Sequence, residues 1–315
     1  MTLSKKDTQL LKLLLQSTEN SLMRACEYLL TEKYGKHNVF AKKDFIYATG
    51  DIPILLVAHL DTVLDKAPII FTAEDNNIWY GKKGLGADDR AGVFAILKII
   101  QSNRRPSILF TTGEEIGGIG AMTFVKEFPE PPVPTKYIIE IDRRGKGQAV
   151  FYDCGNSKFM SYVESFGFKT HQGIFSDISF ICPHWDVAGV NLSAGYSNEH
   201  THFESLNIEH LFYTIERVNK MLDDANNASM YAFEGYSEQL RMLYSQCQIC
   251  GKIVPLFSTT NVQGTNTCIE CVSTYVEWCS NCGKPHFITS EEELLSEEKL
   301  CEECANELRK NSATI

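Results

Sequence analysis

Two features that define whole classes of protein are missing from this 315-residue sequence. There is no basic excess, because 30 lysines and arginines stand against 40 aspartates and glutamates and give a formal net charge of −10. Non-specific binding to nucleic acid or to an anionic membrane is therefore not expected. No uninterrupted apolar run approaches the roughly 18 residues of a membrane helix. The leucine-rich residues 1–16 are interrupted by Lys12 and lack a following small-residue cleavage site, so we predict a helix, no signal peptide and a cytoplasmic protein.

Cysteine is scarce in the first 246 residues and dense in the last 69. Of 11 cysteines, only Cys26, Cys154 and Cys182 lie in the long part, and the other eight form four Cys-x-x-Cys pairs. Each pair can place two sulfurs on one turn, so two pairs can close a tetrahedral thiolate site for zinc. We expect two structural zinc ions in a double zinc ribbon over residues 246–315. The alternative, a disulfide-rich module, needs an oxidising compartment.

Spacing leaves the pairing of these cysteines open. We prefer a sequential arrangement, with one ion on Cys247, Cys250, Cys268 and Cys271 and the other on Cys279, Cys282, Cys301 and Cys304. A cross-braced arrangement would join the first pair to the third and the second to the fourth. Residues 247–315 hold five basic and ten acidic residues, including Glu291, Glu292, Glu293, Glu297 and Glu298, which disfavours nucleic acid as a partner. A protein partner, a cover over an active site and a stabilising appendage remain as roles.

Strand-like and helix-like segments alternate over residues 1–228. Apolar runs predict buried strands at 54–60, 107–112, 137–141 and 190–193, and helical spacing predicts helices at 90–102, 117–128 and 208–222. This alternation indicates one α/β domain with a largely parallel sheet and helices on both faces. Residues 229–245 are expected to connect it to the ribbons.

Acids and histidines stand at the ends of these predicted strands. They are His59 and Asp61 in VAHLDTV, Asp88 and Asp89 in GLGADDR, Glu114 and Glu115 in TTGEEIGG, Asp142 in YIIEID, and His200 and His202 in GYSNEHTHFE. Ligand sites in such folds lie at the carboxyl ends of the strands. Carboxylates that gather there need a cation, because like charges repel strongly in a partly dry site. Mixed oxygen and nitrogen ligands suit zinc, manganese or cobalt, and a bridging carboxylate gives a two-metal site that ionises a water.

The segments AHLDTV, GLGADDRAG, TTGEEIGGIGA, EIDRRG and NLSAGYSNEHTHFE resemble, in order and type, the co-catalytic metallopeptidases. That group contains di-zinc aminopeptidases, carboxypeptidases and related amidohydrolases. The resemblance covers about residues 39–224. It implies a three-layer α/β/α, phosphorylase/hydrolase-like fold with a mostly parallel central sheet.

The resemblance also implies roles for single residues. His59 and Asp142 would bind the first metal, Glu115 and His200 the second, and Asp88 would bridge the two. Glu114 would be the general base on a metal-bridging water, and Asp61 would orient His59. The cofactors implied are two co-catalytic zinc ions, or manganese or cobalt, beside the two structural zinc ions.

Two spacings favour a compact, lidless branch of the group. Only 28 residues separate His59 from Asp88, and only 57 separate Asp142 from His200, which leaves no room for the large inserted domains of some relatives. We predict an amide-cleaving hydrolase, foremost an aminopeptidase-like exopeptidase, acting on a peptide. An N-acyl amidohydrolase or deacylase acting on a small N-acyl substrate is one alternative. The other is an inactive adaptor that binds proteins through its ribbons.

Several neighbouring residues carry secondary expectations. Asp89 suits a structural or capping role at the next helix, where an acid is favoured. Tyr196 is a candidate for stabilising the tetrahedral intermediate, and Ser176 with Asp177 for contacting substrate. Arg143 or Arg144 could bind a substrate carboxylate or form a surface ion pair.

Overall fold

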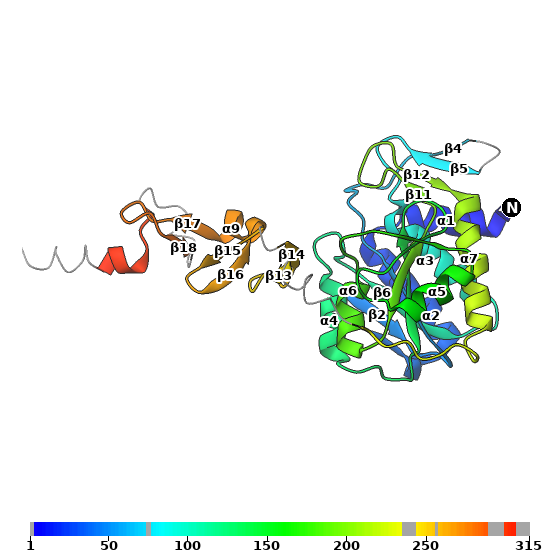
Figure 1. The fold of residues 1–315 in the computed structure, drawn as a ribbon. Coiled ribbons are helices and arrows are strands. Elements are labelled where there is room, and N and C mark those ends of the chain that lie inside the picture. Colours follow the sequence, from blue (N-terminus) through cyan, green and yellow to red (C-terminus); the bar gives the residue numbers. More distant parts are fainter. Residues whose placement is uncertain (1–2, 74–76, 235–243, 256–257, 289–298, 307–315) are drawn as a thin grey trace, which may run out of the picture. The chain divides into compact units, whose positions relative to one another are not determined.

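The computed structural model describes residues 3–73, 77–234, 244–255, 258–288 and 299–306. The chain divides into two units, Met1–Gly235 and Tyr236–Ile315 (Figure 1). This division falls inside the predicted connecting segment, of which residues 235–243 lie outside the described residues. The acidic run at 291–298 lies outside them too. Among the helices of the described residues, none has the length and apolar composition needed to span a bilayer.

An eight-stranded sheet forms the centre of the first unit. Its strands lie in the order β1 (Val39–Ala41), β2 (Phe45–Ala48), β6 (Pro106–Thr111), β3 (Ile52–His59), β7 (Tyr137–Arg143), β10 (Gly189–Ser193), β8 (Gln148–Val150) and β9 (Lys169–His171). The four central strands, β6, β3, β7 and β10, are parallel, while β1, β2 and β8 join by antiparallel pairing. All four strands predicted from apolar runs are present, and they are these central four. The predicted, mostly parallel α/β sheet is confirmed.

Alternating side chains of the central strands form two separate cores. In β3, Ile54, Leu56 and Ala58 face one core, whereas Leu55 and Val57 face the other. This follows from the two-residue period of an extended strand, and it explains why a strand covered on both faces is apolar throughout. The result is the predicted three-layer α/β/α arrangement.

Helices cover both faces of this sheet. The first core is closed by α1 (Lys5–Gln16), α2 (Glu19–Tyr34), α3 (Ala87–Ile100), α5 (Ser157–Ser165) and α7 (Ile208–Asp223), and the second by α4 (Ile119–Glu127) and α6 (Ile178–Trp185). A 3-10 turn, η1 (Lys36–Asn38), follows α2. Several helices begin at a polar cap whose side chain accepts a backbone N–H, as Ser4, Thr18, Asn156 and Asn207 do. In contrast, α3 begins at Gly86, which offers no side chain.

A second, antiparallel sheet was not predicted. It has the order β11 (Tyr196–Ser197), β12 (Ser205–Asn207), β5 (Ile78–Gly81) and β4 (Ile70–Ala73). Its strands have only two to four residues, and three of the four residues of β4 are exposed, so no buried apolar run marks them. The β4–β5 pair occupies the short stretch between His59 and Asp88, and β11 and β12 flank His200.

The second unit is built from short pairs of strands. They are β13 (Tyr244–Gln246) with β14 (Ile253–Pro255), β15 (Thr259–Val262) with β16 (Thr265–Cys268), and β17 (Val276–Trp278) with β18 (Pro285–Phe287), and α9 (Ile269–Tyr275) follows β16. Its buried side chains are mainly cysteines, in two clusters. So small an apolar core makes metal binding the expected source of its stability.

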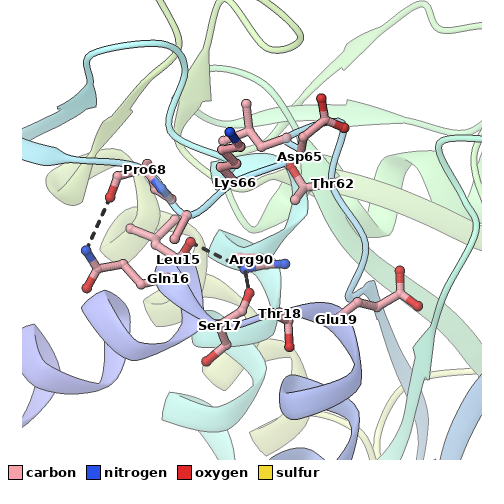
Figure 2. Close-up of a pocket in the computed structure, with 12 residues that line it drawn as sticks. Leu15, Gln16, Ser17, Thr18, Glu19, Thr62, Asp65, Lys66, Pro68 and Arg90 are labelled. Carbon is pink, nitrogen blue, oxygen red and sulfur yellow. Dashed lines mark hydrogen bonds between the residues drawn. The ribbon is translucent and has the colours of Figure 1, made fainter.

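A buried arginine attaches the N-terminal helices to α3. Arg90 is only 4% exposed, and its Nη1 donates to the carbonyl oxygens of Leu14, at 2.8 Å, Leu15 and Ser17 at the end of α1. Figure 2 shows this contact beside a cavity of about 220 Å³. The cavity is lined by residues 15–19, by Arg90 and by the loop that follows Asp61, including Thr62 and Pro68.

Arg90→Met keeps the apolar stem and removes the guanidinium, leaving three helix-end carbonyls without a charged donor. Because hydrogen bonds to charged groups each contribute about 1.5–3 kcal/mol, we expect a loss of roughly 2–4 kcal/mol in unfolding free energy, measured by urea denaturation. Arg104→Met is the matched control, since Arg104 pairs with the exposed Asp223 and such pairs contribute at most about 1 kcal/mol. Equal losses in the two variants would contradict the anchoring role of Arg90.

Candidate metal and active site

The strand ends bring the predicted site residues to one edge of the sheet. His59 is the last residue of β3, Asp142 lies near the end of β7, and Glu114 and Glu115 follow β6. Asp88 lies at the start of α3, and His200 lies in the loop between β11 and β12. Since β6, β3 and β7 are parallel neighbours, their carboxyl ends must meet at this edge.

Asp88 lies between two groups of side chains, with one oxygen facing each. Its Oδ1 is 3.2 Å from Nε2 of His59, and its Oδ2 is 3.2 Å from Nε2 of His200. Nε2 of His59 also lies 3.5 Å from Oδ1 of Asp142, and Nε2 of His200 lies 2.8 Å from Oε2 of Glu115. The two groups are therefore His59 with Asp142 and His200 with Glu115, the sets expected from the sequence.

Asp61 contacts three of the predicted site residues: His59, Glu114 and Glu115. Its Oδ1 is 3.3 Å from Nδ1 of His59, the ring nitrogen that points away from Asp88. Its carboxylate also accepts the backbone N–H of Glu115, at 3.2 Å, and of Glu114, at 3.4 Å. One acid thus orients the His59 ring and the turn that carries both glutamates, in agreement with the orienting role proposed for it.

Asp142 is held by polar groups that the sequence did not single out as ligand supports. Asn191 accepts the Asp142 backbone N–H at 2.8 Å and donates to the Ser176 hydroxyl, which in turn donates to Oδ2 of Asp142. The Tyr196 hydroxyl donates to Oδ1 of Asp142 at 3.0 Å. Tyr196 was expected to stabilise an intermediate and Ser176 to contact substrate, but both hydroxyls are engaged with Asp142. Asn191 is the first residue of the NLSAGYSNEHTHFE segment, but nothing in that segment marks it as a support, and its place in β10 beside β7 reveals the role.

The site holds more negative charge than its own side chains neutralise. Burial raises the pKa of Glu115 to about 7 and that of Asp142 to about 6, and in both cases the nearby Asp88 carboxylate raises it further. Burial also raises the pKa of Glu114 well above its ordinary value. Asp88 differs, because contacts with His200 and His59 outweigh its burial and hold its pKa below the usual range. The balancing positive groups are the two imidazoles. Burial opposes the charge on His59, but Asp142, Asp61 and Asp88 outweigh it and raise the pKa of His59 well above its ordinary value, and contacts with Asp88 and Glu115 raise the pKa of His200 to about 9.

These residues fit divalent cations. Carboxylate oxygens and imidazole nitrogens are the donors that zinc, manganese and cobalt accept. Ligand atoms of His59, Asp88 and Glu115 all lie within 4.8 Å of one another, close enough for these three residues to hold a metal ion. Divalent cations would also balance the clustered carboxylates.

The remaining acids and bases near the site have other contacts. Asp89 accepts the Gly92 N–H at 3.0 Å, which agrees with a capping role within α3. Arg144 pairs with Glu199, and Arg143 donates to the Gln172 carbonyl, so both guanidiniums have protein partners. His202 is exposed.

Two fully buried acids, Glu140 and Asp177, lie behind Asp142 and were not predicted from the sequence as a buried pair. Asp177 donates its backbone N–H to Glu140 and accepts from the Thr111 hydroxyl. Burial raises the pKa of Asp177 to about 7.

The eight cysteines of the second unit form two groups of four in sequential order. The thiols of Cys247, Cys250, Cys268 and Cys271 lie within 4.8 Å of one another, and so do those of Cys279, Cys282, Cys301 and Cys304. The sulfur of Cys250 is 3.8 Å from that of Cys268, and the sulfur of Cys282 is 3.7 Å from that of Cys301. Sulfurs about 2.3 Å from a tetrahedral zinc are about 3.8 Å apart, so both groups fit a zinc ribbon.

Comparison with known proteins finds similarity to peptidases. Residues 39–179 match the family model of Peptidase family M28. A probable carboxypeptidase of Aspergillus niger is 33% identical over 110 residues, which are 32% of this chain. Over residues 39–179 the chain is therefore similar to peptidases of family M28. The matched segment contains the predicted site residues His59, Asp61, Asp88, Glu114, Glu115 and Asp142. His200 lies outside it, and the fold brings its Nε2 to 3.2 Å from Oδ2 of Asp88.

Solved structures of aminopeptidases share the fold. A tripeptidase from Staphylococcus aureus covers 71% of this chain over 99% of its own length, at 15% identity and a TM-score of 0.54. A TET aminopeptidase from a marine sediment archaeon covers 71% over 99%, at 12% identity and a TM-score of 0.55. The chain spans about a quarter of the length of the A. niger relative, 26%.

Asp88→Ala removes the carboxylate that faces both ligand groups. If Asp88 bridges two ions, the variant loses metal from both positions, and metal analysis after dialysis finds only the ions held by the cysteines. Asp65→Ala is a control, because Asp65 lies in the loop after β3 and lines the cavity of Figure 2. A full metal complement in the Asp88 variant would contradict bridging.

Proposed function

We propose that the first unit is a metal-dependent peptidase that removes residues from a peptide end as an aminopeptidase, with Glu114 as its general base. The observation that carries this proposal is the position of Asp88, whose two oxygens face His59 on one side and His200 on the other. A carboxylate so placed suits a pair of neighbouring cations. The similarity of residues 39–179 to Peptidase family M28 supports a peptide bond as the target.

We infer that His59 and Asp142 would hold one cation, that Glu115 and His200 would hold the other, and that Asp88 would contact both. When bound, the two cations supply Lewis-acid polarisation of the carbonyl and lower the pKa of an attacking water. Zinc is the expected metal, with manganese or cobalt as substitutes, and two further zinc ions would be held by the cysteines.

Two contacts support Glu114 as the residue that would move a proton in this site. It neighbours the ligand Glu115, yet its own carboxylate lies further from His59 than those of Asp88 and Asp142 do, with Oε2 4.0 Å from Nε2. Asp61 fixes its backbone through the Glu114 N–H. Glu114 would take a proton from the attacking water and deliver it to the amine that departs, which is general base and then general acid catalysis.

Short peptides with free or blocked ends test this proposal. With zinc, manganese or cobalt added, we expect release of the N-terminal residue from peptides with a free amine, and loss of this activity on chelation. Glu114→Gln should bind metal normally while kcat falls by about 10²–10⁴-fold. Glu127→Gln is the matched control, since Glu127 forms an exposed pair with Lys42.

Each other outcome is informative. Cleavage of N-acylated substrates alone would favour the deacylase alternative. A metal-loaded protein that cleaves neither class would contradict catalysis and favour an adaptor. Full activity of Glu114→Gln would contradict the assignment of Glu114 as general base but would leave the proposed peptidase activity in place.

A further inference from the structure

One carboxylate from a distant loop caps the start of α3. Glu204 Oε2 accepts the backbone N–H groups of Leu85, at 2.9 Å, and Gly86, at 2.6 Å. Its Oε1 accepts those of Ala87, at 2.8 Å, and Asp88, at 3.1 Å. Four successive N–H groups thus converge on one side chain that is only 2% exposed. The cap that Gly86 cannot provide comes from a residue 118 positions further along the chain.

The glycines of this segment allow so close an approach. A Cβ on Gly84 would lie 3.2 Å from the Thr201 carbonyl oxygen and 3.7 Å from Oε2 of Glu204. Gly84 and Gly86 also have φ values of +96° and +69°, which residues with a Cβ rarely adopt. The Gly-Leu-Gly sequence therefore lets the backbone before Asp88 pack directly against the loop of Thr201 and Glu204.

Glu204 belongs to the loop that carries His200. A short turn connects the two residues, with the Glu204 N–H donating to the Thr201 carbonyl at 3.3 Å. One end of this loop therefore places His200 against Oδ2 of Asp88, and the other end binds the N–H of Asp88 itself. Two contacts therefore fix Asp88 and His200 relative to each other: the one between their own side chains, and the one between the Glu204 carboxylate and the Asp88 backbone.

We propose that Glu204 is a positioning residue that holds the Asp88 segment and the His200 loop as one unit and so sets the affinity of the site for its second metal. This inference rests on the proposed function, because it takes Asp88 and His200 as ligands. A simple helix cap would affect stability alone. A positioning residue also affects metal affinity, since groups that orient metal ligands typically change it 10–100-fold.

Zinc titration of the full-length protein separates these possibilities. The carboxylate site is first emptied by mild chelation, and the ions bound to the cysteines serve as an internal reference. Glu204→Gln keeps the shape of the side chain but loses its charge and exchanges one acceptor oxygen for a donor that faces backbone N–H groups. We expect zinc binding at the carboxylate site to weaken by about 10–100-fold, with the cysteine-bound ions unchanged.

Two further variants keep the test decisive. Glu204→Asp retains the charge on a shorter side chain and should recover part of the affinity; it also serves if Glu204→Gln does not fold. Glu199→Gln is the matched control, because Glu199 lies in the same loop but pairs with Arg144. The zinc affinity of the carboxylate site in this variant should stay within about twofold of that of the original protein, well short of the 10–100-fold effect expected for Glu204→Gln.

Wild-type zinc affinity in a folded Glu204→Gln protein with lowered stability would overturn the inference and leave a simple cap. If the unaltered protein bound no zinc beyond that on its cysteines, the proposed function itself would fail, which is a distinguishable result.

Discussion

Repulsion among carboxylates at one edge of the sheet is the constraint on which the site depends. Asp61, Asp88, Glu114, Glu115 and Asp142 come together around two histidines, and burial with mutual repulsion raises the pKa of Glu114, Glu115 and Asp142. Five carboxylates need more positive charge than these two imidazoles can supply. Two divalent cations would provide it, and the proposed chemistry uses the same cations to activate water and carbonyl. In this account the same two cations would both balance the carboxylate charge and supply the catalytic chemistry.

Hydrogen bonds from neighbouring side chains hold most of the predicted metal ligands in position despite this repulsion. Asp61 orients His59 and the glutamate turn, Asn191 and Tyr196 hold Asp142, and Glu204 holds the backbone that carries Asp88. These supports come from different elements of the sheet edge, so the ligand positions are set by the three-layer fold rather than by one loop. The second unit follows a different principle, since its buried side chains are mainly cysteines, and the sulfur positions alone indicate tetrahedral sites.

Much of this organisation could be predicted from sequence, and the remainder could not for definite reasons. The central strands appear as continuous apolar runs because helices cover both of their faces, and the acids mark where those strands end. The small sheet was missed because β4, β5, β11 and β12 are too short, and β4 too exposed, to leave a pattern. Asn191 and Glu204 were missed as supports because their roles depend on register and on contacts across more than 40 and 110 residues. Glu204 had one signal, its place four residues after His200.

Anomalous diffraction from zinc-loaded crystals, recorded on both sides of the zinc absorption edge, measures the central claim most directly. The account predicts two neighbouring peaks about 3.5–4 Å apart, one beside His59 and Asp142 and one beside Glu115 and His200, with Asp88 between them. Peaks confined to the two cysteine groups, with none beside Asp88, would contradict it.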